Sequence, residues 1–344
     1  MNPMQRVMTA MGQAEPDRVP LFILATMHGA RDLGLSIKDY YSRAEHVVEG
    51  QLRLREKYRS DCLNPAFYAA VEVEAFGGET IFIEDGPPNA GAPVLRQDAD
   101  IDRVKVPRLE DCPGLQRGLE AIRQLKAQVG DDIPILGSVI SPFSLPIMQM
   151  GFEHYLDFLY GQPERFDRLM AVNQAFCVTW ANAQLEAGAT AIGYADPLAS
   201  TTLLPRAFYL KTGHRVALDT LPRIRGSVAI HLGSGRGLSL ADDFAATGTV
   251  AVGVSAQEDL GHWKLAAGKR FALLGNLNGV EMRRWSAEDA EREVKRAIAK
   301  AGQGGGFILA DNHGEIPWQV PDEVLLAIRD AVERWGHYPL DWKE

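Results

Sequence analysis

Short apolar runs alternate with amphipathic stretches along the whole chain. Apolar runs that predict buried strands occur at residues 18–25, 80–84, 133–139, 189–194, 227–231, 249–255, 271–276 and 306–310. Between them lie long amphipathic helical patterns at 43–58, 163–187, 287–301 and 321–335. This alternation is typical of a parallel sheet wound with helices. It predicts an α/β protein, a (β/α)8 TIM-type barrel with an N-terminal extension. Residues 80–84 also suit a hairpin beside the barrel, because a Gly-Pro-Pro turn follows them.

Composition narrows the class of protein. The chain has 344 residues without a linker, repeat or low-complexity tract, so we predict one domain over residues 1–344. A net charge of -9 argues against a nucleic-acid partner. Neither a charged-then-apolar leader nor an apolar run of about 18 residues is present, which predicts a cytoplasmic protein without a membrane partner. Three scattered cysteines argue against a disulfide framework.

Polar residues follow several predicted strands at the point where each strand ends. In chain order they are Asp196, His231, Asn276, Asp311, His313 and Glu315. Each has an ordinary structural explanation taken alone; Asp196 before a proline, for example, suits a turn. In a barrel, however, the carboxyl ends of the strands surround one cavity. The repetition at four strand ends therefore predicts a single site lined by Asp196, His231, Asn276 and His313.

Several motifs together carry a family resemblance. They are EPDRVP at 15–20, EVEAFGG at 72–78, EDGPP at 84–88, SPFSL at 141–145, ADP at 195–197, GN at 275–276 and GFIL at 306–309. Their order and spacing resemble the cobalamin-dependent methyltransferase branch of the uroporphyrinogen decarboxylase superfamily. The resemblance implies a β/α barrel with a deep funnel at its C-terminal mouth, often in a homodimer.

The resemblance implies two rival reactions, of which decarboxylation fits poorly. Decarboxylases of the superfamily hold porphyrinogen carboxylates with paired arginines, whereas residues 22–31 retain only Arg31. The aspartate that meets the pyrrole nitrogens corresponds to Tyr68. A polycarboxylate without its arginines would leave buried anions unpaired, which is costly. Decarboxylation is therefore kept only as an alternative.

Thiol-directed methyltransferases of the superfamily hold zinc with a His-x-Cys pair and a later cysteine. The histidine matches His231, but the two cysteine positions match Gly233 and Gly314. Nearby donors are His313 and Glu315, which are harder ligands than thiolate or serve as acid/base groups. A zinc ion held by His231, His313 and Glu315 is thus left open.

These observations favour an O-demethylase component that moves a methyl group from a methoxylated aromatic to the cobalt of a corrinoid protein. The Asp-x-His-x-x-Gly loop of a cobalamin domain is incomplete, since residue 316 is Ile, so the cobalamin must arrive on a separate protein. Alternatives are methyl transfer between methylcobalamin and a thiol or pterin, and a non-catalytic binding barrel.

The predicted roles fall into two groups. The catalytic candidates are His313, His231, Glu315 and, more weakly, the phenol of Tyr68. The candidates for binding substrate or cofactor are Asp196, Asn276, Asp311, His28, Gly233, Gly235 and Trp318. Gly233 and Gly235 belong to a glycine-rich loop suited to an anion, and Trp318 to flanking an aromatic ring.

Overall fold

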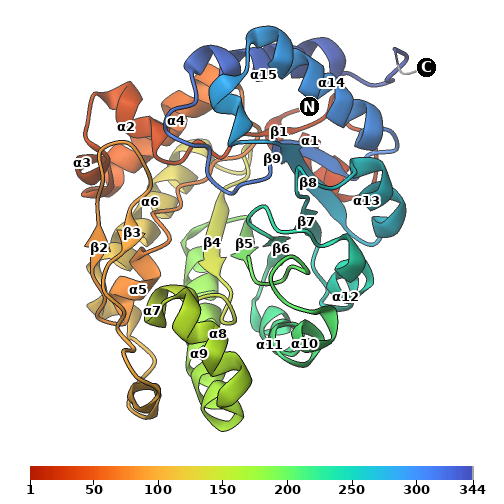
Figure 1. Cartoon of the computed structure of the whole chain (residues 1–344). Coiled ribbons are helices and arrows are strands. Elements are labelled where there is room, and N and C mark those ends of the chain that lie inside the picture. The colour runs from red at the N-terminus through yellow and green to blue at the C-terminus, as the bar shows by residue number, and fades with distance from the viewer. Residues whose placement is uncertain (343–344) are drawn as a thin grey trace.

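The computed structural model describes residues 1–342, and its centre is a curled sheet of parallel strands (Figure 1). The spatial order is β1-β9-β8-β7-β6-β5-β4. The strands are β1 (Leu21–Phe22), β4 (Leu136–Ile140), β5 (Ala191–Ala195), β6 (Ser227–His231), β7 (Ala251–Gly253), β8 (Ala272–Leu277) and β9 (Phe307–Asp311). Each overlaps a predicted strand, and the predicted α/β barrel class is confirmed.

The eighth position of the ring is filled by residues 61–63, which the sequence pattern did not predict. Asp61 N donates to Leu21 O of β1 at 2.7 Å. Leu63 N donates to Pro134 O at 2.9 Å and Leu63 O accepts from Leu136 N at 2.8 Å, which joins the segment to β4. The predicted strand at 80–84 was wrong as a barrel strand. It contributes β2 (Thr80–Ile81), which pairs antiparallel with β3 (Asn89–Ala90) in a separate hairpin.

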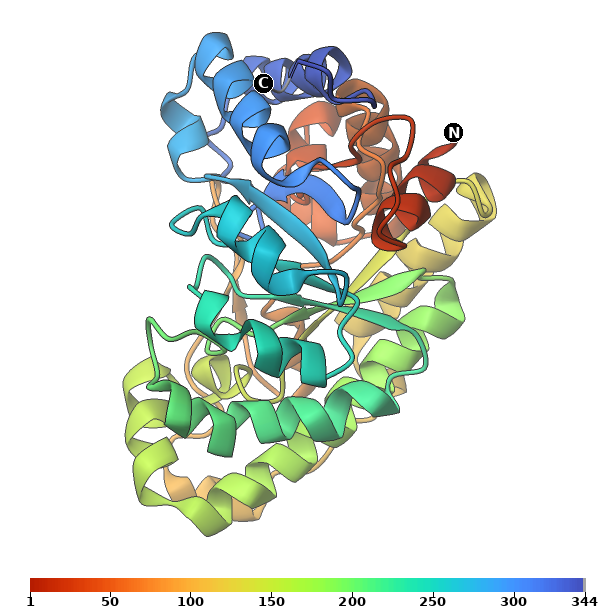
Figure 2. The ribbon, with the colours of Figure 1, turned by 90° about the vertical axis from the view of Figure 1, so that its right-hand side faces the viewer.

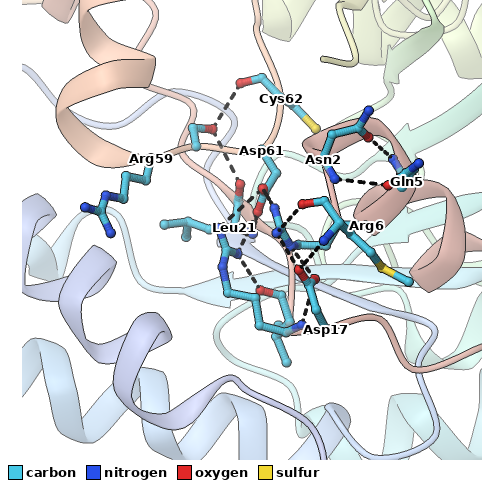
Figure 3. Close-up of polar contacts among 12 residues, drawn as sticks. Asn2, Gln5, Arg6, Asp17, Leu21, Arg59, Asp61 and Cys62 are labelled. Carbon is cyan, nitrogen blue, oxygen red and sulfur yellow. Dashed lines mark hydrogen bonds and ion pairs between the residues drawn. The ribbon is translucent and has the colours of Figure 1, made fainter. Parts of the chain in front are cut away.

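A buried carboxylate fixes this closing segment (Figure 3). Asp61 accepts from Arg6 Nη1 at 2.6 Å, from Arg18 Nη1 at 2.8 Å and from Leu21 N at 2.8 Å. Arg6 also binds Asp17 through two of its nitrogens. Because a buried charge is stable only when it is paired and hydrogen-bonded, Asp61 locks helix α1 (Pro3–Met11) and β1 to the same short segment.

Helix α1 closes the N-terminal end of the barrel (Figure 2). Asn2 caps the helix, and Ala10 O accepts a hydrogen bond from Gly306 N just before β9. Val7, Ala10 and Met11 pack against inward-facing residues of the β1 region and β9, including Phe22 and Ile308. The predicted N-terminal extension therefore acts as a plug of apolar side chains.

The longer helices cover the outside of the sheet. The predicted patterns became α4 (Ala44–Tyr58), α9 (Pro163–Ala187), α14 (Ala287–Ala301) and α15 (Asp322–Trp335). Further helices are α2 (His28–Leu33), α3 (Ile37–Tyr41), α5 (Val71–Ala75), α6 (Pro113–Val129), α7 (Pro146–Met150), α8 (Phe152–Gly161), α10 (Arg206–Lys211), α11 (Gly213–Thr220), α12 (Ala241–Ala246) and α13 (Leu260–Ala267). Short 3-10 turns are η1 (Asp98–Asp102), η2 (Leu109–Asp111), η3 (Leu221–Arg223), η4 (Leu238–Leu240) and η5 (Glu281–Arg284).

Local signals set the ends of these helices. Ser286 and Asp289 form a reciprocal capping box at the start of α14, and Gly188 ends α9 in the left-handed region. Among residues 1–342, no helix is both long and apolar enough to span a bilayer.

Candidate active site

A cavity of about 280 Å³ lies inside the barrel toward the carboxyl ends of the strands. Its apolar walls come from Phe22, Leu24, Phe67, Val71, Ile122, Leu136, Trp180 and Leu274. The hollow exists because the inner faces of β5 and β6 carry small residues, Gly193, Ala195 and Ala229. In the register, Ile140, Ala195 and His231 form one level, and Ser138, Gly193 and Ala229 form the next, about 6.7 Å deeper.

His231 is the last residue of β6 and lines the cavity. Gly233 N donates to its Nδ1 at 3.1 Å, which places the proton of the neutral ring on Nε2. Burial, together with the nearby charge of His313, lowers the pKa of His231 to about 4. The imidazole is therefore neutral at pH 7 and presents an N–H donor.

His313 lies at the entrance, where it both lines the cavity and is exposed. Its Nδ1 is 2.6 Å from Ser234 Oγ, which fixes the ring against the loop after β6. Partial burial lowers the pKa of His313. Both histidines predicted as catalytic are thus found together at the mouth of one cavity.

Two carboxyl groups accompany the histidines. Asp311 Oδ2 accepts from the backbone N–H groups of His313 and Gly314, at 2.7 and 3.2 Å, while its buried Oδ1 has no partner. Burial raises the pKa of Asp311 to about 6. Glu315 accepts a hydrogen bond from Thr26 Oγ1, and burial raises its pKa to about 7. Glu315 can therefore give or take a proton near neutral pH.

Tyr68 also lines the cavity. Its hydroxyl donates to Glu74 Oε1 at 2.9 Å, and Phe82 packs against the ring edge at 5.1 Å between centroids. Burial, reinforced by the charge of Glu74, raises the pKa of the phenol. Because its proton is already engaged, Tyr68 is better suited to shaping the wall than to supplying a proton.

Sequence reasoning missed Glu72 of α5. Its side chain lines the cavity although the residue is only 3% exposed. Oε1 accepts from Ile140 N at 3.0 Å, whereas Oε2 is buried without a partner. Burial raises the pKa of Glu72 to about 8. The available signal was not periodicity but its place as the first residue of the EVEAFGG motif at 72–78.

The prediction of one cavity lined by four strand-end residues was wrong for Asp196 and Asn276. Asp196 is buried, and its Oδ1 accepts from Ser141 Oγ at 2.8 Å and Ser144 Oγ at 2.6 Å. Asn276 Nδ2 donates to the backbone oxygens of Ser255 and Glu258, at 3.0 and 3.1 Å. It borders a separate, smaller cavity. Both lie at the carboxyl ends of their strands, but their polar atoms hold loops together.

Four other binding candidates also lie outside the lining of the main cavity: His28, Trp318, Gly233 and Gly235. His28 is buried, with Trp318 at 5.7 Å between ring centroids. The glycine-rich loop is held down by the Glu258 carboxylate, which accepts from the N–H groups of residues 237 and 238 at 3.0 and 2.9 Å. These contacts account for the loop without an anion.

The zinc site left open by the sequence is not supported. Within residues 1–342, no three His, Cys, Asp or Glu side chains converge as metal ligands, so His231, His313 and Glu315 do not form such a set. A Cβ on Gly314 would lie 3.2 Å from His231 Cε1, so this position does adjoin the histidine. Gly233 and Gly314 have φ of +52° and +93°, however, and the backbone at both positions disfavours any side chain.

The family model for uroporphyrinogen decarboxylase (URO-D) matches residues 2–335. The chain belongs to the uroporphyrinogen decarboxylase family. A uroporphyrinogen decarboxylase of Cellvibrio japonicus is 28% identical over 272 residues, covering 76% of this chain and 75% of its own.

Two solved structures share the family's barrel. A methyltransferase from Methanosarcina mazei superposes with a TM-score of 0.86 at 20% identity, covering 97% of this chain and 99% of its own. A B12-independent methionine synthase from Shewanella sp. W3-18-1 gives a TM-score of 0.57 at 14% identity, covering 86% and 89%. At these identities the likeness establishes the fold.

Proposed function

We propose that this family member transfers a methyl group from a methoxylated aromatic compound to the cobalt of a separate corrinoid protein. One observation carries the proposal: an apolar cavity whose polar end combines a neutral His231 with Glu315, a carboxyl group that titrates near pH 7. Its volume of about 280 Å³ lies just below the usual range for small-molecule sites and suits a single aromatic ring.

The charge of the lining argues against decarboxylation of a porphyrinogen. None of the described residues that line the cavity is lysine or arginine, whereas three acidic residues line it: Glu72, Asp311 and Glu315. A polycarboxylate would bring further negative charge into a low-dielectric space that already holds three acids. The paired arginines that hold porphyrinogen carboxylates are also missing from residues 22–31.

Methyl transfer is motivated by the likeness to the Methanosarcina mazei methyltransferase, which extends over nearly the full length of both chains. A thiol acceptor is less well supported, because glycines occupy both positions that matched sulfur ligands and no metal-binding cluster replaces them in residues 1–342. An aryl ether poses a different problem, the leaving phenolate, for which a proton donor is needed.

The side chains present meet that need. The bound corrinoid supplies a cobalt nucleophile for the methyl carbon. The apolar walls hold the ring and exclude water, which strengthens every polar interaction in the cavity. As the methyl–oxygen bond breaks, protonated Glu315 donates its proton to the ether oxygen, and the product leaves as a neutral phenol.

The histidines assist this transfer from the same end of the cavity. His231 Nε2–H offers a hydrogen bond to the developing negative charge on the oxygen. His313, at the entrance, contributes to the surface that the corrinoid protein has to cover.

The test is to mix the purified protein with Co(I) corrinoid proteins and a panel of methoxyphenols, and to follow the absorbance change to methyl-Co(III). Methylation of at least one corrinoid protein by an aryl ether is expected. Activity on methylated thiols or amines with none on any aryl ether contradicts the substrate class. Failure to methylate any corrinoid contradicts the reaction itself.

A further inference from the structure

The main cavity has polar groups at two separate places in the ring of strands. His231, Asp311 and Glu315 belong to the ends of β6 and β9. Glu72 is bonded to Ile140 N at the end of β4. With residues 61–63 counted as a member of the ring of eight, β4 is three positions from β9 and two positions from β6.

Apolar residues, among them Leu136, Trp180 and Leu274, make up much of the rest of the lining, and the small residues of β5 leave space between β4 and β6. A ligand that fills the cavity therefore meets apolar surface together with polar groups near the end of β4 and near the ends of β6 and β9. A ring with two polar substituents has this pattern, and the methoxy group accounts for only one of them.

Glu72 has bonding capacity that the protein does not use. Oε1 is satisfied by Ile140 N, whereas Oε2 is buried without a hydrogen-bond partner of normal geometry, although the Trp180 indole is close enough to lower the pKa of Glu72 below what burial alone would give; the residue lines the cavity. A buried polar atom without a partner is costly, so its retention here points to a partner that arrives with the ligand. Ser138, one level deeper on β4, also lines this part of the cavity.

The charge balance defines what that partner is. The described lining residues include three carboxyl groups and no lysine or arginine. Burial holds the pKa of Glu72 at about 8, so it is mostly a neutral acid at pH 7 and can donate its own proton. A neutral oxygen on the ligand can accept that proton, whereas a carboxylate on the ligand would lack a counter-charge.

We propose that Glu72 binds a second, uncharged oxygen substituent on the substrate ring, so that the enzyme selects methoxyphenol-type ligands over ethers lacking that group and over methoxybenzoates. This inference rests on the proposed function, since it names the substrate class of the same cavity. Glu72 acts here in recognition, at the end of the ring remote from the methyl group.

Calorimetric binding without any corrinoid protein tests the inference separately from the reaction. The ligands are methoxybenzene, 3-methoxyphenol, 4-methoxyphenol and 4-methoxybenzoate, at pH 7. The tighter of the two methoxyphenols is expected to bind about tenfold better than methoxybenzene, the scale of one buried hydrogen bond. Methoxybenzoate is expected to bind more weakly than methoxybenzene.

Two variants and a matched control identify the residue responsible. Glu72→Leu should bring the ratio between methoxyphenol and methoxybenzene close to one, because the hydrogen bond is removed. Glu72→Gln should keep part of the preference, since the amide is neutral and still donates. Glu120→Gln makes the same substitution on an exposed helical position outside the cavity and should leave the ratio unchanged.

The outcomes separate the two claims. An unchanged ratio in both Glu72 variants, or tighter binding of methoxybenzoate than of methoxyphenol, overturns the inference and leaves the reaction standing. Binding as expected, without methyl transfer to any corrinoid protein, supports the inference and overturns the reaction. If Glu72→Leu does not fold, the binding ratio in Glu72→Gln and the wild-type affinities for the four ligands still test the inference. Failure of all four ligands to bind overturns both.

Discussion

The strand ends that line the cavity and the strand ends that do not are alike in sequence but differ in their hydrogen bonds. Asp196 is paired with two serine hydroxyls and Asn276 with two backbone oxygens. Asp311, by contrast, keeps one buried oxygen without a partner, and His231 lines the cavity with its Nδ1 bonded to Gly233 N, which leaves Nε2 as the protonated nitrogen. A polar residue at a strand end thus marks a site only where bonding capacity remains unused; elsewhere it braces the loops that frame the site.

Removing the histidines is the strongest way to test this contrast. His231→Ala and His313→Ala should each lower turnover about 10²-fold or more, while thermal unfolding stays close to wild type. His262→Ala, on the exposed side of α13, is the matched control and should retain full turnover. Wild-type turnover in both cavity variants would refute their role.

For Asp196→Ala we expect reduced stability with unchanged turnover, the opposite of the result expected for the histidine variants. The free energy of unfolding should fall by about 2 kcal/mol, because the two serine hydroxyls lose their acceptor in a buried place. The fraction that remains folded at low temperature should turn over normally. Denaturant titration and kcat measured on the same preparation check both halves. A large loss of kcat at wild-type stability would return Asp196 to the residues that act on the substrate, as the sequence predicted for it in binding.

The pH dependence of the rate tests Glu315. Burial raises its pKa from 4.5 to about 7, so the protonated donor is abundant below pH 7 and disappears as the pH rises above it. Turnover should therefore fall about tenfold between pH 6 and pH 8. Glu315→Gln should be slower at pH 6 and lose this decline. A decline of equal size in the variant would assign the titration to another group.

The smallest effect concerns Gly314, which lies against His231. Gly314→Ala places a Cβ 3.2 Å from His231 Cε1 at φ +93°, whereas Gly34→Ala meets nothing within 4 Å at φ +65°. Both should lose about 1 kcal/mol of stability to the backbone conformation. Only Gly314→Ala should also lower kcat, because it displaces the imidazole. Equal kcat in the two variants would mean that the position of His231 is not critical.

The sequence was sufficient to predict the features that repeat along the chain. Apolar runs predicted all seven strands of the sheet, and helical spacing predicted α4, α9, α14 and α15 closely. Polar residues after strands identified His231, Asp311, His313 and Glu315, which do line one cavity. Their catalytic roles stay predictions, as do the single domain and the corrinoid partner.

Features that depend on contacts between residues far apart in the chain could not be predicted from the sequence. The closing segment 61–63 is too short to show a strand pattern, and its position depends on Arg6 and Arg18. Whether Asp196 is free or satisfied depends on Ser141, 55 residues earlier in the chain. Glu72 gives no periodic signal, because a single buried acid on a short helix has the same spacing as a solvated one.

The plug formed by α1 has a consequence for the order of events in a catalytic cycle. Val7, Ala10 and Met11 fill the N-terminal end of the barrel, so we expect the aromatic substrate and the corrinoid protein to share the opening at the C-terminal end. The methoxylated aromatic substrate must enter before the corrinoid protein covers that opening. The demethylated phenol can depart only after the corrinoid protein has dissociated. Steady-state kinetics should then be ordered and sequential, with the phenol competing against the methoxylated ring but not against the corrinoid protein.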